Sequence, residues 1–227
     1  MKTLELYDHF DGNILDLWEI TIPDTVYKED VSLTTKDSIL TFEVTKTKKS
    51  KDPYDWEGPR LIAKKPKLAG VETSLGLDFG DCRGNGNVYV RGIGYEFLYL
   101  LGIDNPSSDI FFHVFDVNTG RYAPGGRIHH KGHFPNRTTL VAPELVSLGI
   151  RWEENKTFYS IDERQYEFSV PERLGKTLSE RLLKDSQQIA DEGLKELCIK
   201  VDLYTPDEKR PSTIKALIDS VDVESSK

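Results

Sequence analysis

The sequence predicts an all-β protein built as a two-sheet antiparallel sandwich. Three observations lead to this prediction: many short runs rich in β-branched and aromatic residues, turn residues between them, and a single segment with helical periodicity. About a dozen short strands with one helix fit two packed sheets, whereas an up-and-down barrel would show shorter, more uniform hairpins and no mid-chain helix. One large β domain can occupy 227 residues, so we expect residues 1–227 to form a single domain.

The first half of the chain contains one clear hairpin and several further strands. Residues 31–35 and 39–44 alternate apolar and polar positions, and the turn residues between them predict a hairpin. The loop at 83–87 (Arg-Gly-Asn-Gly-Asn) has strong turn chemistry, because Gly and Asn tolerate positive φ. Further strands are expected at 61–63, 71–79, 88–91, 95–101 and 110–116, and the last two are apolar at nearly every position, as central strands are.

The second half of the chain continues the same pattern. Residues 145–152 and 156–161 flank a short polar turn and predict a second hairpin. The remaining expected strands are 166–170, 197–203 and 214–223.

One short helix is expected near residues 178–192. Thr177 and Glu180 have the spacing of a capping box, in which each side chain bonds a free backbone N–H of the first turn. Leu178, Leu182 and Ile189 fall on one helical face, and Gly193 supplies the usual left-handed stop. We expect this helix to cover one end of the sandwich.

The charge balance argues against nucleic acid and membrane surfaces as partners. Thirty Lys and Arg face 38 Asp and Glu, a formal net charge of −8. A negative surface repels phosphate backbones and anionic lipid. The one basic cluster, the lysines within 46–51, contains no interleaved aromatic residue and predicts a solvated loop.

The chain shows no sign of export or membrane insertion. Its first residues lack the apolar run of a signal peptide, and no apolar stretch approaches membrane-spanning length. We therefore expect a cytoplasmic protein. Cys82 and Cys198 are then expected to be buried or free thiols, because disulfides are rare in that compartment.

Several segments resemble concanavalin A-like jelly-roll domains, the lectin/glucanase superfamily. They span nearly the whole chain and occur in the order found there. In chain order they are 7–12 (Tyr-Asp-His-Phe-Asp-Gly) followed by Leu17-Trp18, then 58–61 (Gly-Pro-Arg-Leu), then 150–152 with 157–162, and finally 216–223. The pair 150–152 and 157–162 resembles two strands that end in an Asp-Gly turn, which here reads Asp162-Glu163. The segment 216–223 resembles the last strand of the superfamily, which returns beside the first.

The resemblance implies two curved sheets with a glycan ligand on the concave face. Members of the superfamily include lectins, glycan-binding modules, glycoside hydrolases and polysaccharide lyases, so the fold indicates only a broad substrate class. Laminarinase-like hydrolases carry Glu-x-Asp-x-Glu or Glu-x-Asp-x-x-Glu on a concave strand, where alternate residues face the same way and set the acid and nucleophile about 5 Å apart. The chain lacks this motif, and leucines follow Glu96 where the partner carboxylates would stand.

Aromatic and planar polar residues supply the candidate ligand-binding set, because sugars present a C–H face and hydroxyl edges. Tyr95 and Tyr99 alternate with Phe97 on one expected strand and share a face, which either binds a ligand or packs between the sheets. Trp56 lies in a loop rich in Pro and Asp that leads into a strand. The candidate ligand-binding residues are Tyr54, Trp56, Arg60, Tyr95, Tyr99 and His113.

Two further sites concern carboxylates. Glu96 is the candidate catalytic acid, since burial between aromatic neighbours would raise its pKa; alternatively, an arginine such as Arg60 or Arg91 neutralises it across the sheet. The resemblance also implies a structural calcium between the first and last strands, held by Asp11 and Asp219; alternatively, both aspartates cap turns. No other cofactor is expected.

The sequence leaves three functions open. The leading one is a lectin-like carbohydrate-recognition domain that binds an oligo- or polysaccharide on the concave face without catalysis. The second is a glycoside hydrolase or polysaccharide lyase with a non-standard active site. The third is a non-enzymatic interaction or scaffold domain that keeps the fold but not the sugar. The sequence determines neither the glycan nor the oligomeric state.

Overall fold

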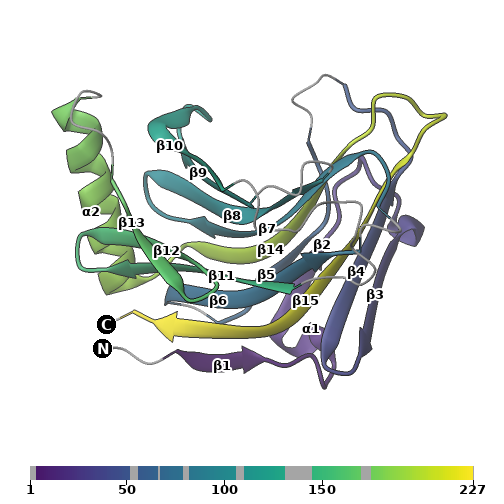
Figure 1. Cartoon of the computed structure of the whole chain (residues 1–227), viewed down its shortest axis with the longest axis horizontal. Helices are drawn as coiled ribbons and strands as arrows, with labels where there is room; N and C mark the ends of the chain where they lie inside the picture. The colour runs from purple at the N-terminus through teal and green to yellow at the C-terminus, as the bar shows by residue number, and fades with distance from the viewer. Residues whose placement is uncertain are drawn as a thin grey trace.

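A computed structural model shows two antiparallel β-sheets packed face to face (Figure 1). It describes residues 4–51, 56–65, 67–78, 82–105, 110–130, 145–169 and 175–226. The predicted all-β sandwich with one substantial helix is confirmed.

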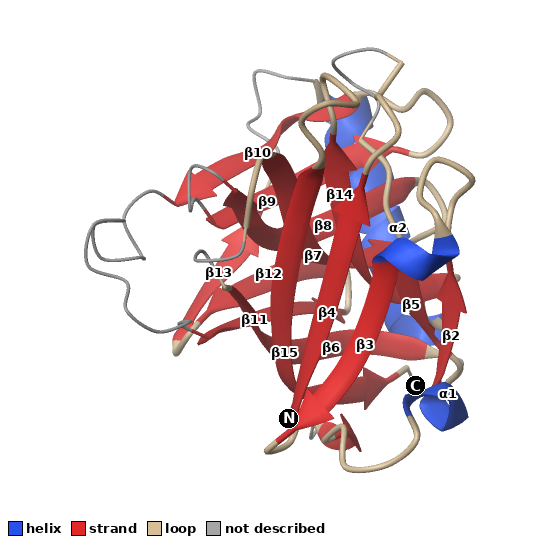
Figure 2. Cartoon of the chain, turned by 90° about the vertical axis from the view of Figure 1, so that its right-hand side faces the viewer, coloured by secondary structure: helices blue, strands red, loops and turns tan. Residues whose placement is uncertain are grey.

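The larger sheet, here called sheet A, has eight strands in the order β13-β12-β11-β6-β15-β4-β3, with β1 added on β15. Figure 2 shows β3, β4 and β15 side by side on the face toward the viewer. The first and last strands pair antiparallel, as the resemblance implied, and the two chain ends lie together (Figure 1). The strands are β1 (Glu5–Asp8), β3 (Val31–Lys36), β4 (Ile39–Lys46), β6 (Leu68–Leu77), β11 (Leu145–Glu153), β12 (Lys156–Ile161), β13 (Arg164–Phe168) and β15 (Ser212–Ser225).

The second sheet, sheet B, has seven strands in the order β10-β9-β8-β7-β14-β5-β2. A one-turn helix α1 (Ile14–Leu17) precedes β2, and a 3₁₀ turn η1 (Lys28–Asp30) precedes β3. The strands of sheet B are β2 (Trp18–Thr21), β5 (Arg60–Ala63), β7 (Asn85–Ile93), β8 (Phe97–Asn105), β9 (Ile110–Asp116), β10 (Tyr122–His130) and β14 (Glu196–Tyr204).

Both predicted hairpins form. Asp37 and Ser38 join β3 to β4 with φ values of 52° and 61°. Two successive positive φ angles match the right-handed twist of the strands that they connect. In the second hairpin Leu148 lies opposite Ile161 and Glu153 opposite Lys156.

Large side chains from the two sheets interdigitate to form the core. The rings of Tyr99 on β8 and Trp152 on β11 meet edge to face at 5.1 Å, and Phe112 on β9 stacks on Tyr159 of β12 at 4.6 Å. All four are buried. Offset and edge-to-face contacts of this kind stabilise beyond the area that they bury.

The Asp-His-Phe-Asp-Gly segment has a structural explanation. The Asp8 carboxylate accepts hydrogen bonds from the Trp18 indole Nε1 and from the Phe10 backbone N, each at 2.7 Å. Phe10 takes φ 58° and places its ring, 1% exposed, parallel to that of Trp18 at 6.5 Å. The segment therefore closes the core beside β2.

Helix α2 (Lys176–Glu192) covers one end of the sandwich, as expected, and stands at the left of Figure 1. Gly193 ends it with φ 86°, and its N–H bonds the Ile189 carbonyl. The predicted capping box was wrong: Gly175 is the N-cap, and Thr177 already lies inside the first turn. Leu182 and Ile189 face the core as predicted.

Lys46 corrects the expected solvated lysine cluster. It is the last residue of β4, is fully buried, and its Nζ donates to Ser50 Oγ at 3.1 Å and to the Leu203 carbonyl at 3.2 Å. Cys82 and Cys198 are free thiols, as predicted. Within the described ranges no helix is long and apolar enough to cross a membrane.

Candidate functional site

The outer face of sheet B lies on the inner side of the curve that the two sheets follow. In Figure 1 sheet B lies above sheet A, and strands of both sheets rise toward the right-hand end of the view. The curvature therefore leaves the outer face of sheet B concave, the face on which the resemblance implied a ligand.

Strict alternation decides which side chains reach this face. On β14 the odd-numbered residues 197–203 enter the core, so the even-numbered residues 196–204 point outward. On β7, β8 and β9 the buried inner residues likewise alternate with outer ones. The partly exposed outer residues of the central strands are Arg60, Asn87, Arg91, Leu98, Asp104, His113, Phe115, Glu196, Lys200 and Tyr204.

Ion pairs fix the polar half of the face, which β5, β14 and β7 form. Arg60 lies 3.4 Å from Glu196, and their side chains are 29% and 22% exposed. Lys200 lies 2.7 Å from Asp202, and their side chains are 16% and 9% exposed. The Tyr89 hydroxyl, on the next strand, donates a short hydrogen bond to Asp202.

Burial keeps two acidic groups of this half protonated. It raises the pKa of the Tyr89 phenol well above its ordinary value, and the neighbouring Asp202 carboxylate raises it further. Burial also raises the pKa of the Cys198 thiol to about 12. Burial raises the pKa of Asp202 itself, although Lys200 opposes the shift. Neither the phenol nor the thiol is thus an anion near neutral pH.

Arg91 differs from the other two cations of this face. It lies opposite Cys198 on one side and Leu100 on the other. Its buried Nε has no hydrogen-bond partner among the residues that the structure describes.

The other half of the face, on β8 and β9, is mostly apolar, with Asp104 and His113 as its polar residues. Tyr89, Leu100 and Phe111 form a buried cluster outside the main core, with Leu98 and Phe115 packed at its edge. The rings of Tyr89 and Phe111 meet at 6.0 Å across Gly102, which lies opposite both. A Cβ at that glycine would overlap the Tyr89 Cβ and backbone, so only glycine lets the two rings meet.

Two of the predicted ligand-binding residues, Arg60 and His113, lie on this face, and Trp56 lies at its end. The His113 ring contacts that of Phe111 at 4.7 Å. Trp56 stacks at 5.8 Å on Tyr204, the last outward residue of β14. A binding role for these three residues stays a prediction.

Two predicted residues do not belong to the face, and one falls outside the described residues. Tyr99 points into the core, is fully buried, and donates to Asp185 Oδ2 at 2.9 Å; the prediction that it contacts a ligand is wrong. Tyr95 packs at the end of the sandwich, where its hydroxyl meets Glu192 and the Gly193 carbonyl, both at 3.3 Å. Tyr54 lies outside the described residues.

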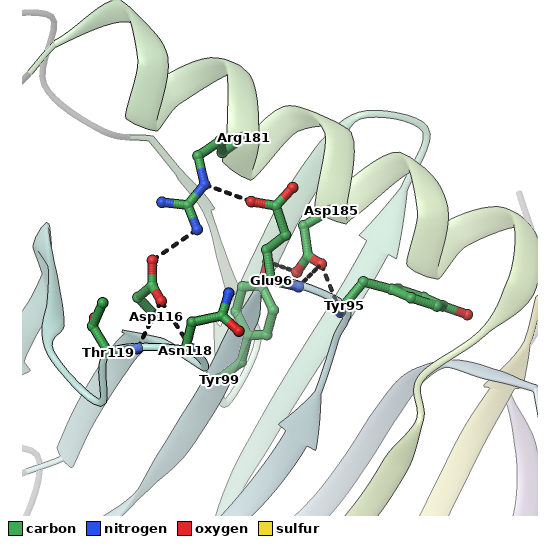
Figure 3. A network of polar contacts seen from close by, with 8 residues as sticks. All are labelled: Tyr95, Glu96, Tyr99, Asp116, Asn118, Thr119, Arg181 and Asp185. Carbon is green, nitrogen blue, oxygen red and sulfur yellow. Dashed lines mark hydrogen bonds and ion pairs between the residues drawn. The ribbon is translucent and has the colours of Figure 1, made fainter.

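Glu96, the candidate catalytic acid, is held by helix α2 (Figure 3). The Arg181 guanidinium bonds Glu96 through Nε and Asp116 Oδ2 at 2.7 Å, and it lowers the pKa of Asp116. An arginine does neutralise Glu96, but it is neither Arg60 nor Arg91. The arrangement ties the helix to the ends of β8 and β9 rather than activating an acid.

No set of three or more His, Cys, Asp or Glu side chains within the described ranges is arranged to hold a metal ion. Asp11 accepts a hydrogen bond at 2.6 Å from the hydroxyl of Ser38, which lies in the turn between β3 and β4. Asp219 lies where the pairing of β15 with β6 shifts register. A calcium ion at this pair stays a prediction from the resemblance.

Along β8 the outward positions are Leu98, Leu100, Gly102 and Asp104, so this strand presents one carboxylate. On β14 the outward carboxylates, Glu196 and Asp202, are six residues apart, which is about 20 Å along a strand. Neither strand therefore places two described carboxylates at the separation of about 5 Å that a retaining glycosidase uses.

Sequence reasoning missed the polar residues of β14. The segment 196–204 reads Glu-Leu-Cys-Ile-Lys-Val-Asp-Leu-Tyr and alternates between polar and apolar residues except at Cys198. That alternation predicts one outward polar face and could have indicated Glu196, Lys200 and Asp202. What it could not supply is the neighbour on β7, because strand order is a tertiary property.

Solved structures share this fold over their full length. The laminarinase catalytic domain from Thermotoga maritima superposes with a TM-score of 0.64 at 15% identity, covering 100% of both chains. LamA from Zobellia galactanivorans, in complex with laminaritriose and laminaritetraose, gives 0.56 at 12% identity over 98% of this chain and 99% of that chain. A Bacteroides ovatus GH16 protein of a mixed-linkage glucan locus, in complex with its product, gives a TM-score of 0.57 at 11% identity, covering 97% of this chain and 99% of that chain.

No protein-family profile and no curated protein sequence matches the chain. The structure has the concanavalin A-like jelly-roll fold of the GH16 glucanases, and identities of this size establish the fold alone.

Proposed function

We propose that this protein binds a carbohydrate on the outer face of sheet B. The observation that carries the proposal is the make-up of this concave face, where polar side chains fixed by ion pairs lie beside partly exposed rings. Hydroxyl groups of a sugar would bond Arg60 and Glu196, and its C–H face would lie on Trp56 or Phe115. The outward row of β14 from Glu196 to Tyr204 spans eight residues, or about 26 Å, enough for several sugar rings.

The face is also organised before a ligand arrives. Arg60 is already paired with Glu196, and Lys200 with Asp202, so their side chains lose little further freedom on binding. Side-chain ordering otherwise opposes association by about 0.5–1.5 kcal/mol for each flexible residue. A preorganised polar row favours recognition of a specific sugar pattern.

Binding without catalysis is the activity that the chemistry favours. The Tyr89 phenol and the Cys198 thiol have raised pKa values, so neither is the anion that nucleophilic attack or proton abstraction requires. Glu96 and Asp116 share the Arg181 guanidinium. We therefore infer a lectin-like role rather than hydrolysis or lysis.

Affinity electrophoresis against a panel of neutral and acidic polysaccharides tests the proposal. Trp56→Ala and Phe115→Ala should each weaken retention several-fold, since stacking on one ring contributes about 0.5–1.5 kcal/mol beyond the area buried. Phe158→Ala is the matched control, because Phe158 is a partly exposed ring on the outer face of sheet A. It should leave retention unchanged.

Two results would contradict the proposal. Retention of no polysaccharide by the wild-type protein would remove the sugar-binding role and favour a scaffold domain. Release of reducing ends or unsaturated uronates from a retained polysaccharide would show an enzyme instead of a binding domain. Thermal midpoints of the variants show whether a lost signal reflects a lost fold.

A further inference from the structure

We propose that the carbohydrate is acidic and that the Arg91 guanidinium binds its carboxylate. This inference rests on the proposed function and names the class of sugar that the same face takes: a uronate-containing oligo- or polysaccharide.

The first step compares the three cations of the outer face. Arg60 is paired with Glu196 and Lys200 with Asp202. Arg91 is in no ion pair within the described part of the chain, and its buried Nε has no hydrogen-bond partner there. A buried charged donor without an acceptor is rare in native proteins and requires an explanation.

The second step asks why the protein offers Arg91 no acceptor. Its cross-strand neighbours are Cys198, whose thiol burial keeps neutral, and Leu100, which is apolar. Asp202 is close enough for Arg91 to lower its pKa, but that carboxylate already holds Lys200 and the Tyr89 hydroxyl. No described residue therefore supplies an acceptor for the Arg91 Nε, and we infer that a bound ligand pairs with this guanidinium.

The third step concerns the chemistry of that acceptor. A guanidinium is planar and forked, and a carboxylate matches it with two parallel hydrogen bonds. Next to Arg91 the face turns apolar at Leu98, Leu100 and Phe115. A uronate residue has both features that this boundary needs: a carboxylate at the ring edge for Arg91 and a C–H face for the apolar side chains.

The negative net charge of the protein means that a measured preference for an acidic sugar would report a specific contact. At a formal charge of −8 the whole chain repels polyanions at long range, so non-specific attraction does not mimic a site. A preference for an acidic sugar over its neutral counterpart then reports a local contact.

The experiment uses three soluble probes with one linkage pattern: laminarin, laminarin oxidised at C6 to uronate, and sulfated laminarin. Isothermal titration calorimetry with the full chain should show oxidised laminarin bound at least tenfold more tightly than laminarin. Arg91→Gln should abolish this difference. Arg151→Gln, a partly exposed arginine on the outer face of sheet A, should preserve it.

A stability measurement separates ligand binding from a structural role. Because the Arg91 Nε has no acceptor among the described residues, Arg91→Gln should leave the thermal midpoint unchanged or raise it, whereas loss of a structural arginine would lower it. Equal affinity for laminarin and its oxidised form would overturn the inference while leaving the proposed function intact. A preference for oxidised laminarin that survives Arg91→Gln would also overturn the inference. Binding of sulfated laminarin as tight as that of oxidised laminarin would overturn it too, because it would indicate a general anion site. Failure to bind any of the three probes or any polysaccharide of the panel would overturn both.

Discussion

Replacing Asp185, the residue that anchors helix α2, should separate the role of its hydrogen bonds from that of its charge. Asp185 is 1% exposed, and its Oδ1 accepts the backbone N–H groups of Tyr95 and Glu96, each at 2.7 Å (Figure 3). Its Oδ2 accepts the Tyr99 hydroxyl at 2.9 Å. Asp185→Ala leaves three donors without their acceptor, at about 1–3 kcal/mol each before relaxation. We expect a loss of about 3–5 kcal/mol in the free energy of unfolding.

Asp185→Asn should be much milder. The amide oxygen can still accept the two backbone N–H groups, and the amide nitrogen can donate to the Tyr99 hydroxyl. We expect a loss of no more than about 1 kcal/mol. Glu180→Ala on the exposed side of the same helix is the control; its pair with Lys176 is 3.6 Å long and should contribute less than about 0.5 kcal/mol.

The pH dependence of the same variants checks the charge. Burial raises the pKa of Asp185, so the folded state binds this proton more tightly than the unfolded state does. The contribution of this group is therefore fully present below the unfolded pKa of about 4 and is lost as pH rises through the higher folded pKa. Asp185→Asn should remove this decline in the free energy of unfolding. The wild type should therefore exceed the variant in free energy of unfolding by the largest amount at low pH.

Urea unfolding followed by circular dichroism at several pH values measures these effects. For a chain of this length 1 kcal/mol corresponds to about 2–4 °C, so Asp185→Ala should lower the thermal midpoint by about 6–20 °C. The reasoning would be refuted if Asp185→Ala shifted the urea midpoint no more than Glu180→Ala does. It would also fail if Asp185→Asn were as damaging as Asp185→Ala.

Three further predictions concern the fold. Asp8→Ala should lower the free energy of unfolding by about 2–4 kcal/mol, because the Trp18 Nε1 loses its acceptor, and the tryptophan emission should shift to the red. Gly102→Ala should lower it by about 1–3 kcal/mol, since the added methyl overlaps Tyr89; near-ultraviolet circular dichroism would report the disturbed rings, and an unchanged spectrum would count against the close packing. Lys46→Ala should lower it by about 2–4 kcal/mol in urea unfolding because the stem is fully buried, whereas a solvated lysine would lose less than about 0.5 kcal/mol.

The sequence by itself determined most of the strands, both hairpins and the helix, because these depend on local periodicity and turn chemistry; β1, β2 and β10 were not among the expected strands. Asp37 and Ser38 adopt the positive φ values that the turn between 31–35 and 39–44 requires. Gly193 ends α2 where its lack of a Cβ permits φ 86°. Each of these features is fixed within a few residues, so a local pattern suffices to predict it.

Only the tertiary structure decided which side chains form the candidate site. Tyr99 belongs to the core and not to a ligand, because the inner residues of β8 pack against Trp152 of the other sheet. Lys46 is buried because Leu203, more than 150 residues away, supplies a carbonyl for it. Arg91 meets Cys198 and Leu100 only after β7 has been placed between β14 and β8. Alternation fixes the direction of a side chain, but its neighbours depend on strand order, which long-range pairing sets and no local pattern records.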